Sequence, residues 1–165
     1  MTTAFRALVA LGIFGLFGIC FGAACVGGAS SPSEPGGAFA FTTVAQAAVP
    51  GQSGGQIRQV IRDSATWARV WSDLQAGSAL PTAPPAIDFQ TDMVIVAAMP
   101  TQPCVSQVTI LSITGDRGSL RVDILEEPPA ANCRCIVSQR PIHAVRLRRS
   151  DATVQFTVTS RPRTC

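Results

Sequence analysis

Seven consecutive apolar residues, Met93 to Met99 (MVIVAAM), lie in the middle part of the chain. A short apolar run without alternation is typical of a β-strand that is covered on both faces. We therefore expect residues 93–99 to form a strand in the middle of a sheet. The rest of the fold then has to cover both faces of that strand.

The stretch DSATWARVWSDLQAG (63–77) predicts an amphipathic helix before this strand. Asp63 or Ser64 can cap its start, and Gly77 can end it in a left-handed conformation. An apolar stripe at helical spacing usually packs into a core, so we expect both Trp side chains to be buried. The stripe consists of Trp67, Val70, Trp71 and Leu74.

Alternating apolar residues predict strands elsewhere in the chain. One strand is expected in residues 55–63 before the helix, and residues 105–127 predict a hairpin whose turn holds Gly115 and Gly118. Residues 141–149 and 152–160 predict a final pair of strands. One early helix and several strands without helices between them indicate an α+β fold, with one N-terminal amphipathic helix packed on a mainly antiparallel β-sheet of five to six strands.

The first 29 residues predict an export leader. Residues 7–29 carry no charge and follow a single Arg6, but the run is longer than the apolar region of an ordinary signal peptide. Three interpretations stay open: a bacterial lipoprotein signal with lipidation at Cys25, an uncleaved membrane anchor, or free secretion. We prefer them in that order, and all three place the folded part outside the cytoplasm, in the cell envelope or beyond.

Residues 30–55 are rich in Ser, Pro, Gly, Ala and Gln and contain one charge, Glu34. This composition is typical of a flexible tether. We therefore expect three parts: a leader or anchor over 1–29, a tether over 30–55 and a folded domain over 56–165.

The order of features in the folded part resembles the C-terminal domain of the PrcB family of protease-complex subunits, found mostly in bacterial envelope proteins and lipoproteins. The resemblance covers residues 56–158, but PTQPCVSQV (100–108) replaces the Gly-rich turn that the family usually places after the buried strand. It implies an extracytoplasmic accessory domain that assembles with another protein, and it supplies no catalytic residues. The features that carry it are Trp71, Asp88, Phe89, the run Met93 to Met99, Pro141, His143 and Val145.

Four cysteines follow the leader: Cys104, Cys133, Cys135 and Cys165. An even number in an exported chain favours disulfides. A bridge between Cys133 and Cys135 is the least favourable pairing, because it closes a very small, strained ring. We expect one of these two to pair with Cys104 and the other with Cys165, and a closed loop of about 30 residues to contribute around 3 kcal/mol.

A rival hypothesis is a thiol-redox or metal-binding envelope protein that uses Cys133, Cys135, Cys104 and His143. Paired zinc ligands usually have two to four intervening residues, and redox cysteines have two, whereas the pair in NCRC has one. We therefore prefer structural disulfides and expect no cofactor. The simplest interpretation of His143 is a partly buried residue on the face that carries Val145 and Leu147.

Basic and acidic residues are distributed unevenly along the chain. Residues 54–133 contain five Arg and eight acidic residues, whereas residues 134–165 contain seven Arg and only Asp151. An exported protein rarely meets nucleic acid, so we expect no nucleic-acid partner. Arg146 and Arg148 lie on the opposite strand face from Val145 and Leu147 and are the candidate partner-binding residues.

These observations favour a non-catalytic extracytoplasmic accessory or protein-binding domain, held at the membrane by its N-terminal anchor. The expected partner is another envelope protein, such as the protease complex that the resemblance implies. The sequence shows no phosphate-binding loop, nucleophile elbow or HExxH motif, and with a single His it excludes catalysis by paired histidines.

Overall fold

The computed structural model describes residues 36–50, 54–77, 81–116 and 118–165. Every described residue belongs to one compact unit, residues 33–165. The predicted leader, with its lipidation candidate Cys25, lies outside the described residues. Among the residues that are described, no helix has the length and apolar character needed to cross a bilayer.

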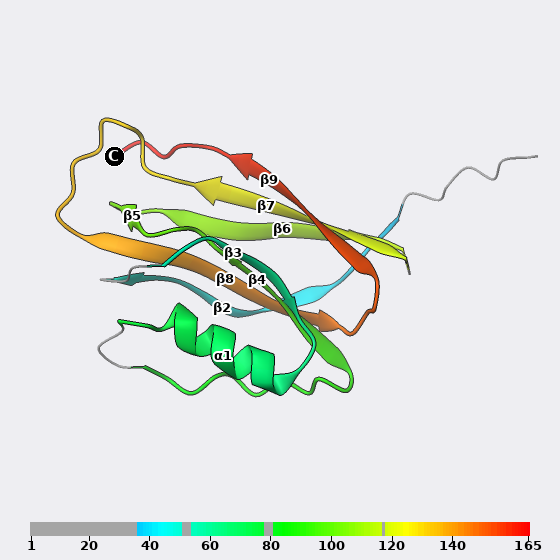
Figure 1. Ribbon diagram of the computed structural model, residues 1–165. Coiled ribbons are helices and arrows are strands. Elements are labelled where there is room, and N and C mark those ends of the chain that lie inside the picture. Colours follow the sequence, from blue (N-terminus) through cyan, green and yellow to red (C-terminus); the bar gives the residue numbers. More distant parts are fainter. Residues whose placement is uncertain (1–35, 51–53, 78–80, 117) are drawn as a thin grey trace, which may run out of the picture. The chain divides into compact units, whose positions relative to one another are not determined.

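The described unit has three layers: one helix and two β-sheets (Figure 1). The helix covers one sheet, called here the helix-side sheet, and the second sheet, called the outer sheet, packs on the opposite face of the first. Most strand pairs are antiparallel, as the sequence predicts. The expected single sheet of five to six strands is instead two sheets, of five and four strands in this part of the chain.

The helix-side sheet has the strand order β2-β8-β4-β3, and a short strand β5 also pairs with β8. Its apolar strand β4 lies between two neighbours, so the prediction of a central strand from the run Met93 to Met99 is confirmed. The bounds are β2 (Phe41–Pro50), β3 (Ile57–Ile61), β4 (Asp92–Ala98), β5 (Gln102–Pro103) and β8 (Ser138–Arg148).

The outer sheet has the strand order β1-β6-β7-β9. Strands β6 and β7 form the predicted hairpin, and its turn begins at Gly115, which has a φ of 148°. A side chain there would collide with the backbone of Ser119, so the turn requires glycine. The bounds are β1 (Gly37–Ala38), β6 (Gln107–Gly115), β7 (Ser119–Glu127) and β9 (Thr153–Ser160).

The helix α1 (Ser64–Leu74) follows the sequence prediction closely. The Asp63 carboxylate accepts a hydrogen bond of 2.7 Å from the Thr66 amide and caps the helix, and this bond lowers the pKa of the carboxyl group. Gly77, beyond the helix end, has a φ of 85°. All four residues of the predicted apolar stripe are buried: Trp67, Val70, Trp71 and Leu74.

Two hydrophobic cores meet at strand β4. Met93, Ile95 and Ala97 point into the core between the two sheets. Val94, Val96 and Ala98 point into the core under the helix. Alternate residues of a strand face opposite sides of its sheet, so one uninterrupted apolar strand serves both cores.

The predicted tether is wrong over part of its length. Residues 37–38 form β1, and residues 41–50 form β2, which pairs with β8 along its whole length. Phe39 and Phe41 pack against the core between the sheets. Burial of these apolar side chains and a full antiparallel ladder hold a segment whose small polar residues resemble a linker.

The predicted final pair of strands is also corrected. Strands β8 and β9 follow each other in sequence but belong to different sheets, and β9 pairs with β7 in parallel. The connection crosses between the sheets, and the Arg62 guanidinium donates hydrogen bonds of 2.9 and 3.0 Å to the carbonyls of Ser150 and Ala152. The two strands share an alternating pattern because each has one face on the core between the sheets.

Candidate protein-binding surface

The four cysteines form two disulfides, one of which holds Cys165 at the C-terminus that Figure 1 marks. Cys104 bonds to Cys135, and Cys133 bonds to Cys165. The prediction that Cys133 and Cys135 take different partners is confirmed, and the structure settles which partner each one takes. Disulfides are typical of oxidising compartments, which supports an extracytoplasmic location.

The loop 128–137 between β7 and β8 is tied to the C-terminal segment. The Arg163 amide donates a 2.8 Å hydrogen bond to the Pro128 carbonyl, and the Ala130 amide donates a 2.9 Å bond to the Arg163 carbonyl. These bonds continue the parallel pairing of β7 with β9, and the disulfide Cys133–Cys165 lies just beyond them. The loop therefore has a fixed support on one side.

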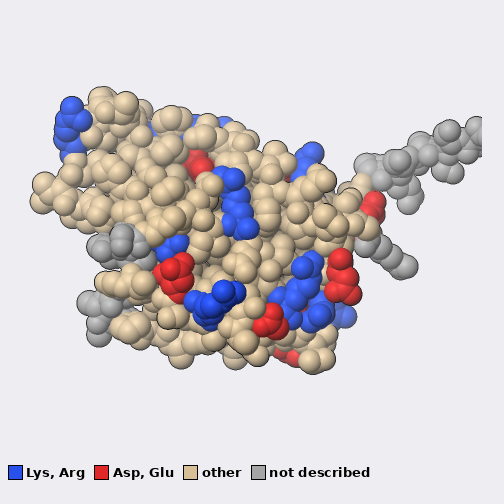
Figure 2. Space-filling model, viewed as in Figure 1, with Lys and Arg blue, Asp and Glu red and all other residues tan. Residues whose placement is uncertain are grey.

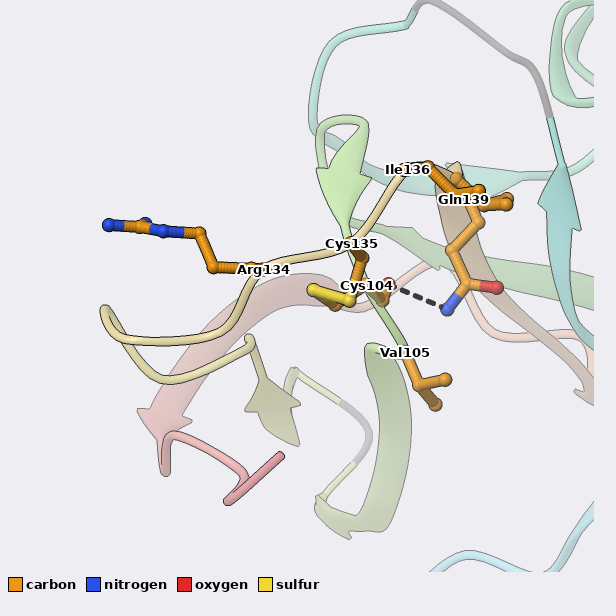
Figure 3. A pocket seen from close by; sticks show the side chains of 7 residues that line it. Cys104, Val105, Arg134, Cys135, Ile136 and Gln139 are labelled. Atoms are coloured by element: carbon orange, nitrogen blue, oxygen red, sulfur yellow. Dashed lines mark hydrogen bonds between the residues drawn. A yellow bond between two sulfur atoms is a disulfide. The ribbon is translucent and has the colours of Figure 1, made fainter.

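Cys104 supports the loop on its other side. Its backbone has a φ of 65°, uncommon for a residue other than glycine. Its amide donates a 3.1 Å hydrogen bond to the Val137 carbonyl, and its own carbonyl accepts a 2.9 Å bond from Gln139 Nε2 (Figure 3). The disulfide to Cys135 adds a covalent link. These contacts compensate for an unfavourable local backbone conformation.

Three large apolar side chains protrude beside this disulfide. Val105 is 67% exposed, Ile136 is 103% exposed and Val137 is 56% exposed. We call these three residues the apolar patch; they line a shallow depression of about 400 Å³ next to the disulfide (Figure 3). Single exposed apolar residues are common, but adjacent ones on a fixed loop are typical of protein-binding sites.

Positive charge borders the apolar patch. Arg134 lines the same depression and extends away from the disulfide (Figure 3). Arg134 is the one charged residue of the loop 128–137. On the face shown in Figure 2, the upper left end, where this loop lies in Figure 1, carries cationic atoms and no acidic atoms. The surface therefore offers apolar contact next to a cation.

Arg146 and Arg148, the predicted partner-binding residues, are exposed near the other end of β8. Arg146 lies seven positions after Gln139, which corresponds to about 20–25 Å along a strand. Arg146 lies 3.8 Å from the Asp92 carboxylate, and Glu126 pairs with Arg58 at 2.9 Å. The structure thus does not bring the two arginines together with the apolar patch.

Strand β8 contributes apolar residues to both cores. Val145 and Leu147 face the core between the sheets, not the helix. The side that faces the helix carries Ile142 and Ala144, and period-two alternation places Arg146 and Arg148 on that same side, beyond the apolar residues. A strand with apolar residues on both faces gives no sequence signal that distinguishes its two sides.

His143 is a buried structural residue in β8, 3% exposed. Its Nδ1 atom accepts a 2.8 Å hydrogen bond from the Ile110 amide, and Nε2 lies 3.1 Å from Thr43 Oγ1. The proton of the neutral ring therefore belongs on Nε2. No cluster of three or more metal-ligating side chains occurs within the described ranges, so the metal set of the rival hypothesis, Cys104, Cys133, Cys135 and His143, is not assembled there.

The contacts of His143 predict a pH-dependent stability. Burial lowers the pKa of His143 below its usual 6.5, and protonation would place an N–H group against the Ile110 amide. The unfolded chain therefore binds a proton below about pH 6.5 that the folded chain does not. The free energy of unfolding should fall as the pH drops from about 6.5 towards the folded pKa. Chemical denaturation at a series of pH values measures this change.

The matched control is His143→Gln, whose amide can accept from Ile110 and donate to Thr43 without titrating. This variant should lose the pH dependence between about pH 6.5 and 5. Asp63 and Asp116 also have lowered pKa values, below 3.8, so their contribution lies at lower pH. An identical slope in both proteins would show that another group titrates.

Arg140 is a buried cation that the sequence does not reveal. It is 1% exposed and donates hydrogen bonds of 2.8 Å to the Gly55 carbonyl and 3.1 Å to the Asp73 carbonyl at the end of α1. Its guanidinium also lies 3.3 Å from the Asp73 carboxylate. A side chain at Gly54 would collide with it. These contacts join the helix end to the start of β8, next to the apolar patch.

The residues on which the resemblance to the PrcB family rests support the fold, in a turn or in a core. Asp88 accepts a 3.0 Å hydrogen bond from the Gln90 amide in the turn before β4, and Phe89 and Trp71 are buried in the core between the helix and its sheet. The resemblance itself stays a prediction that rests on the order of sequence features. Comparisons with family models, with curated proteins and with solved structures found no match to this chain.

Proposed function

We propose that the chain is an extracytoplasmic protein-binding domain whose contact surface is the apolar patch. The observation that carries this proposal is the full exposure of Ile136 on a loop fixed by two disulfides. A loop that is already ordered loses little conformational entropy on binding. Support from both sides therefore favours a preformed contact site.

The surface also indicates the chemistry of its partner. Val105, Ile136 and Val137 can enclose an apolar side chain, and Arg134 at the border can pair with a carboxylate. The partner we propose is a protein segment with an apolar residue flanked by an acidic one. Apolar contacts at the centre of such an interface contribute most of the affinity, while charges at the rim mainly speed association and add specificity.

The proposed location is the cell envelope. Two disulfides support an oxidising compartment, and the apolar leader with Cys25 supports lipid or membrane anchoring. The partner would then be another envelope protein, and the resemblance to the PrcB family makes a protease complex the first one to test. In this proposal the domain is an accessory subunit without catalytic activity.

The test replaces Ile136 with Asp in the full-length protein and measures co-purification of envelope proteins after mild crosslinking. Because the side chain is fully exposed, the melting temperature should stay unchanged. Recovery of the specific partner should fall about tenfold or more, as for loss of a central contact residue. The matched control is Leu111→Asp, which introduces the same charge at another exposed apolar residue, 54% exposed, in β6.

A second arm tests the predicted arginine surface with the double variant Arg146→Gln and Arg148→Gln. If the apolar patch is the contact site, this variant keeps the partner at normal salt and Ile136→Asp loses it. If wild type and Ile136→Asp recover equal amounts of the partner and the arginine variant loses it, the contact lies at the far end of β8. Recovery of no specific partner by any variant, with substrate turnover by the purified protein, would overturn the binding function.

A further inference from the structure

Strand β9 forms an edge of the outer sheet, and no other strand of the described residues pairs with its outer side. It is the last strand in the order β1-β6-β7-β9 and pairs with β7 on one side (Figure 1). The Thr153 and Arg161 amides donate to the Gly118 and Glu126 carbonyls on the β7 side. Backbone groups alternate along a strand, so the amides and carbonyls of Val154, Phe156 and Val158 point away from β7.

This edge lacks the features that usually protect a strand from pairing. Residues 153–160 contain no charged residue and no proline, and their register with β7 is uninterrupted. By contrast, the edge strand β3 carries Arg58, β1 has only two residues, and β2 contains a bulge after Thr43 and ends at Pro50. Charges, prolines, bulges and short length are the usual protection of an edge. Strand β9 is therefore available to a further strand.

The sequence of β9 is self-complementary about Phe156. In an antiparallel pair of two copies centred there, the numbers of facing residues add up to 312, so Val154 faces Val158 and Thr153 faces Thr159 of the other copy. At the two ends, Asp151 faces Arg161 of the other copy. Like apolar pairs and opposite charges directly across a strand pair are both favourable.

The backbone geometry permits this register. A residue that points its amide and carbonyl outward must face another outward residue, so that the two exchange two hydrogen bonds. In the centred register the pairs Phe156–Phe156 and Val154–Val158 meet this condition. The Ala152 carbonyl already accepts from Arg62, which ends the open ladder just before Val154.

In the part of the chain that the structure describes, the charged side chains at the two ends of β9, Asp151 and Arg161, have no interaction that would compete with this pairing. The exposed side chains of Asp151 and Arg161 take part in no hydrogen bond or ion pair among those residues. In a register shifted by two residues, Arg149 would face Arg161 of the other copy. In a register shifted by two residues in the other direction, Arg163 would face Asp151 of the other copy. Arg163 already donates a 3.2 Å hydrogen bond to Gln107, so the centred register is favoured.

We propose that β9 binds β9 of a second copy of this chain in antiparallel orientation, which joins the two outer sheets into one continuous sheet. The contact is isologous, because the same residues of both copies face each other across a two-fold axis at Phe156. It lies on β9 and leaves the apolar patch of each copy open. The proposal does not depend on the proposed function.

A cysteine crosslink tests the proposed register in the full-length protein, purified in detergent. Gln155 faces Thr157 of the other copy in a non-hydrogen-bonded pair, where the two side chains lie closest. Mild oxidation of the double variant Gln155→Cys, Thr157→Cys should give a covalent dimer. Peptide mass analysis should show the cysteine introduced at position 155 of one copy joined to the cysteine introduced at position 157 of the other.

The control for the crosslink is the double variant Thr153→Cys, Thr157→Cys. It should give little dimer, because these two positions face each other only in the shifted register. Equal crosslinking of the two variants, none in either, or a link only to a different protein would overturn the proposal.

Charge exchange provides an independent test. Asp151→Arg and Arg161→Asp should each raise the dimer dissociation constant about tenfold, because each replaces two attractive pairs with two repulsive ones. The double variant with both changes should restore the wild-type constant, measured by energy transfer between labelled copies on dilution. Neither side chain has a partner within the described part of one copy, so the melting temperature of the monomer, measured below the dimer dissociation constant, should stay constant. A double variant as weak as the single ones would contradict the facing pair.

Discussion

Replacing Trp67 with Ala is expected to lower the free energy of unfolding by about 3–5 kcal/mol, the usual cost of removing a large aromatic side chain from a core. Trp67 is 3% exposed, and its ring centre lies 5.1 Å from that of Trp71. Its indole nitrogen also donates a 2.9 Å hydrogen bond to the Pro85 carbonyl. The substitution therefore leaves a cavity and an unpaired carbonyl. Urea denaturation followed by circular dichroism measures the loss.

The control for this prediction is Trp67→Phe, which retains much of the apolar contact but cannot donate to Pro85. Its cost should be clearly smaller than that of Trp67→Ala, because most of the buried surface is kept. A loss of less than about 1 kcal/mol for the alanine variant would contradict the packing of the helix on the sheet.

Removing the disulfide Cys133–Cys165, with both cysteines changed to Ser, is expected to cost about 3–4 kcal/mol. The two cysteines are 32 residues apart in sequence, and the cost follows from the greater freedom of the unfolded chain once this loop is open. The double change avoids leaving one reactive thiol. The denaturation midpoint of the oxidised protein, compared with that of the variant, measures the effect.

Reduction supplies the control for the disulfide prediction. A mild reductant should lower the stability of the wild-type protein by more than that of the variant, because the variant has only Cys104–Cys135 left to lose. An unchanged midpoint in the double variant would contradict the prediction, because the hydrogen bonds between residues 128–130 and 163 belong to the folded state and cannot offset the greater freedom of the unfolded chain.

Much of the secondary structure could be predicted from local sequence patterns. The uninterrupted run in β4, the stripe on α1 and the β6–β7 hairpin each carry a signal within a short window, and each is present. The assignment of strands to sheets could not be predicted, because β8 and β9 show the same alternation whether they lie in one sheet or in two. Strand β2 was missed because its Ala, Thr and Gln residues become a strand only through pairing with a segment about 100 residues later.

The candidate site could be predicted only in part. Cysteine count and spacing made a bridge between Cys133 and Cys135 the least favourable pairing, but choosing between the two other pairings required the fold. The apolar patch has no sequence signal, since Ile136 and Val137 look like the start of a buried strand. Arg140 stands two residues before Ile142 and looks like an exposed charge, yet the end of α1 covers it.

Strand β4 has a consequence for how the molecule unfolds. Its odd-numbered residues line one core and its even-numbered residues line the other. If β4 loses its packing in one core, the other core therefore loses part of the surface that it packs against. The helix layer and the outer sheet are therefore not separate cooperative units, although they do not share a face. Neighbouring positions on this strand report on opposite layers, and a defect at any of them weakens the whole domain.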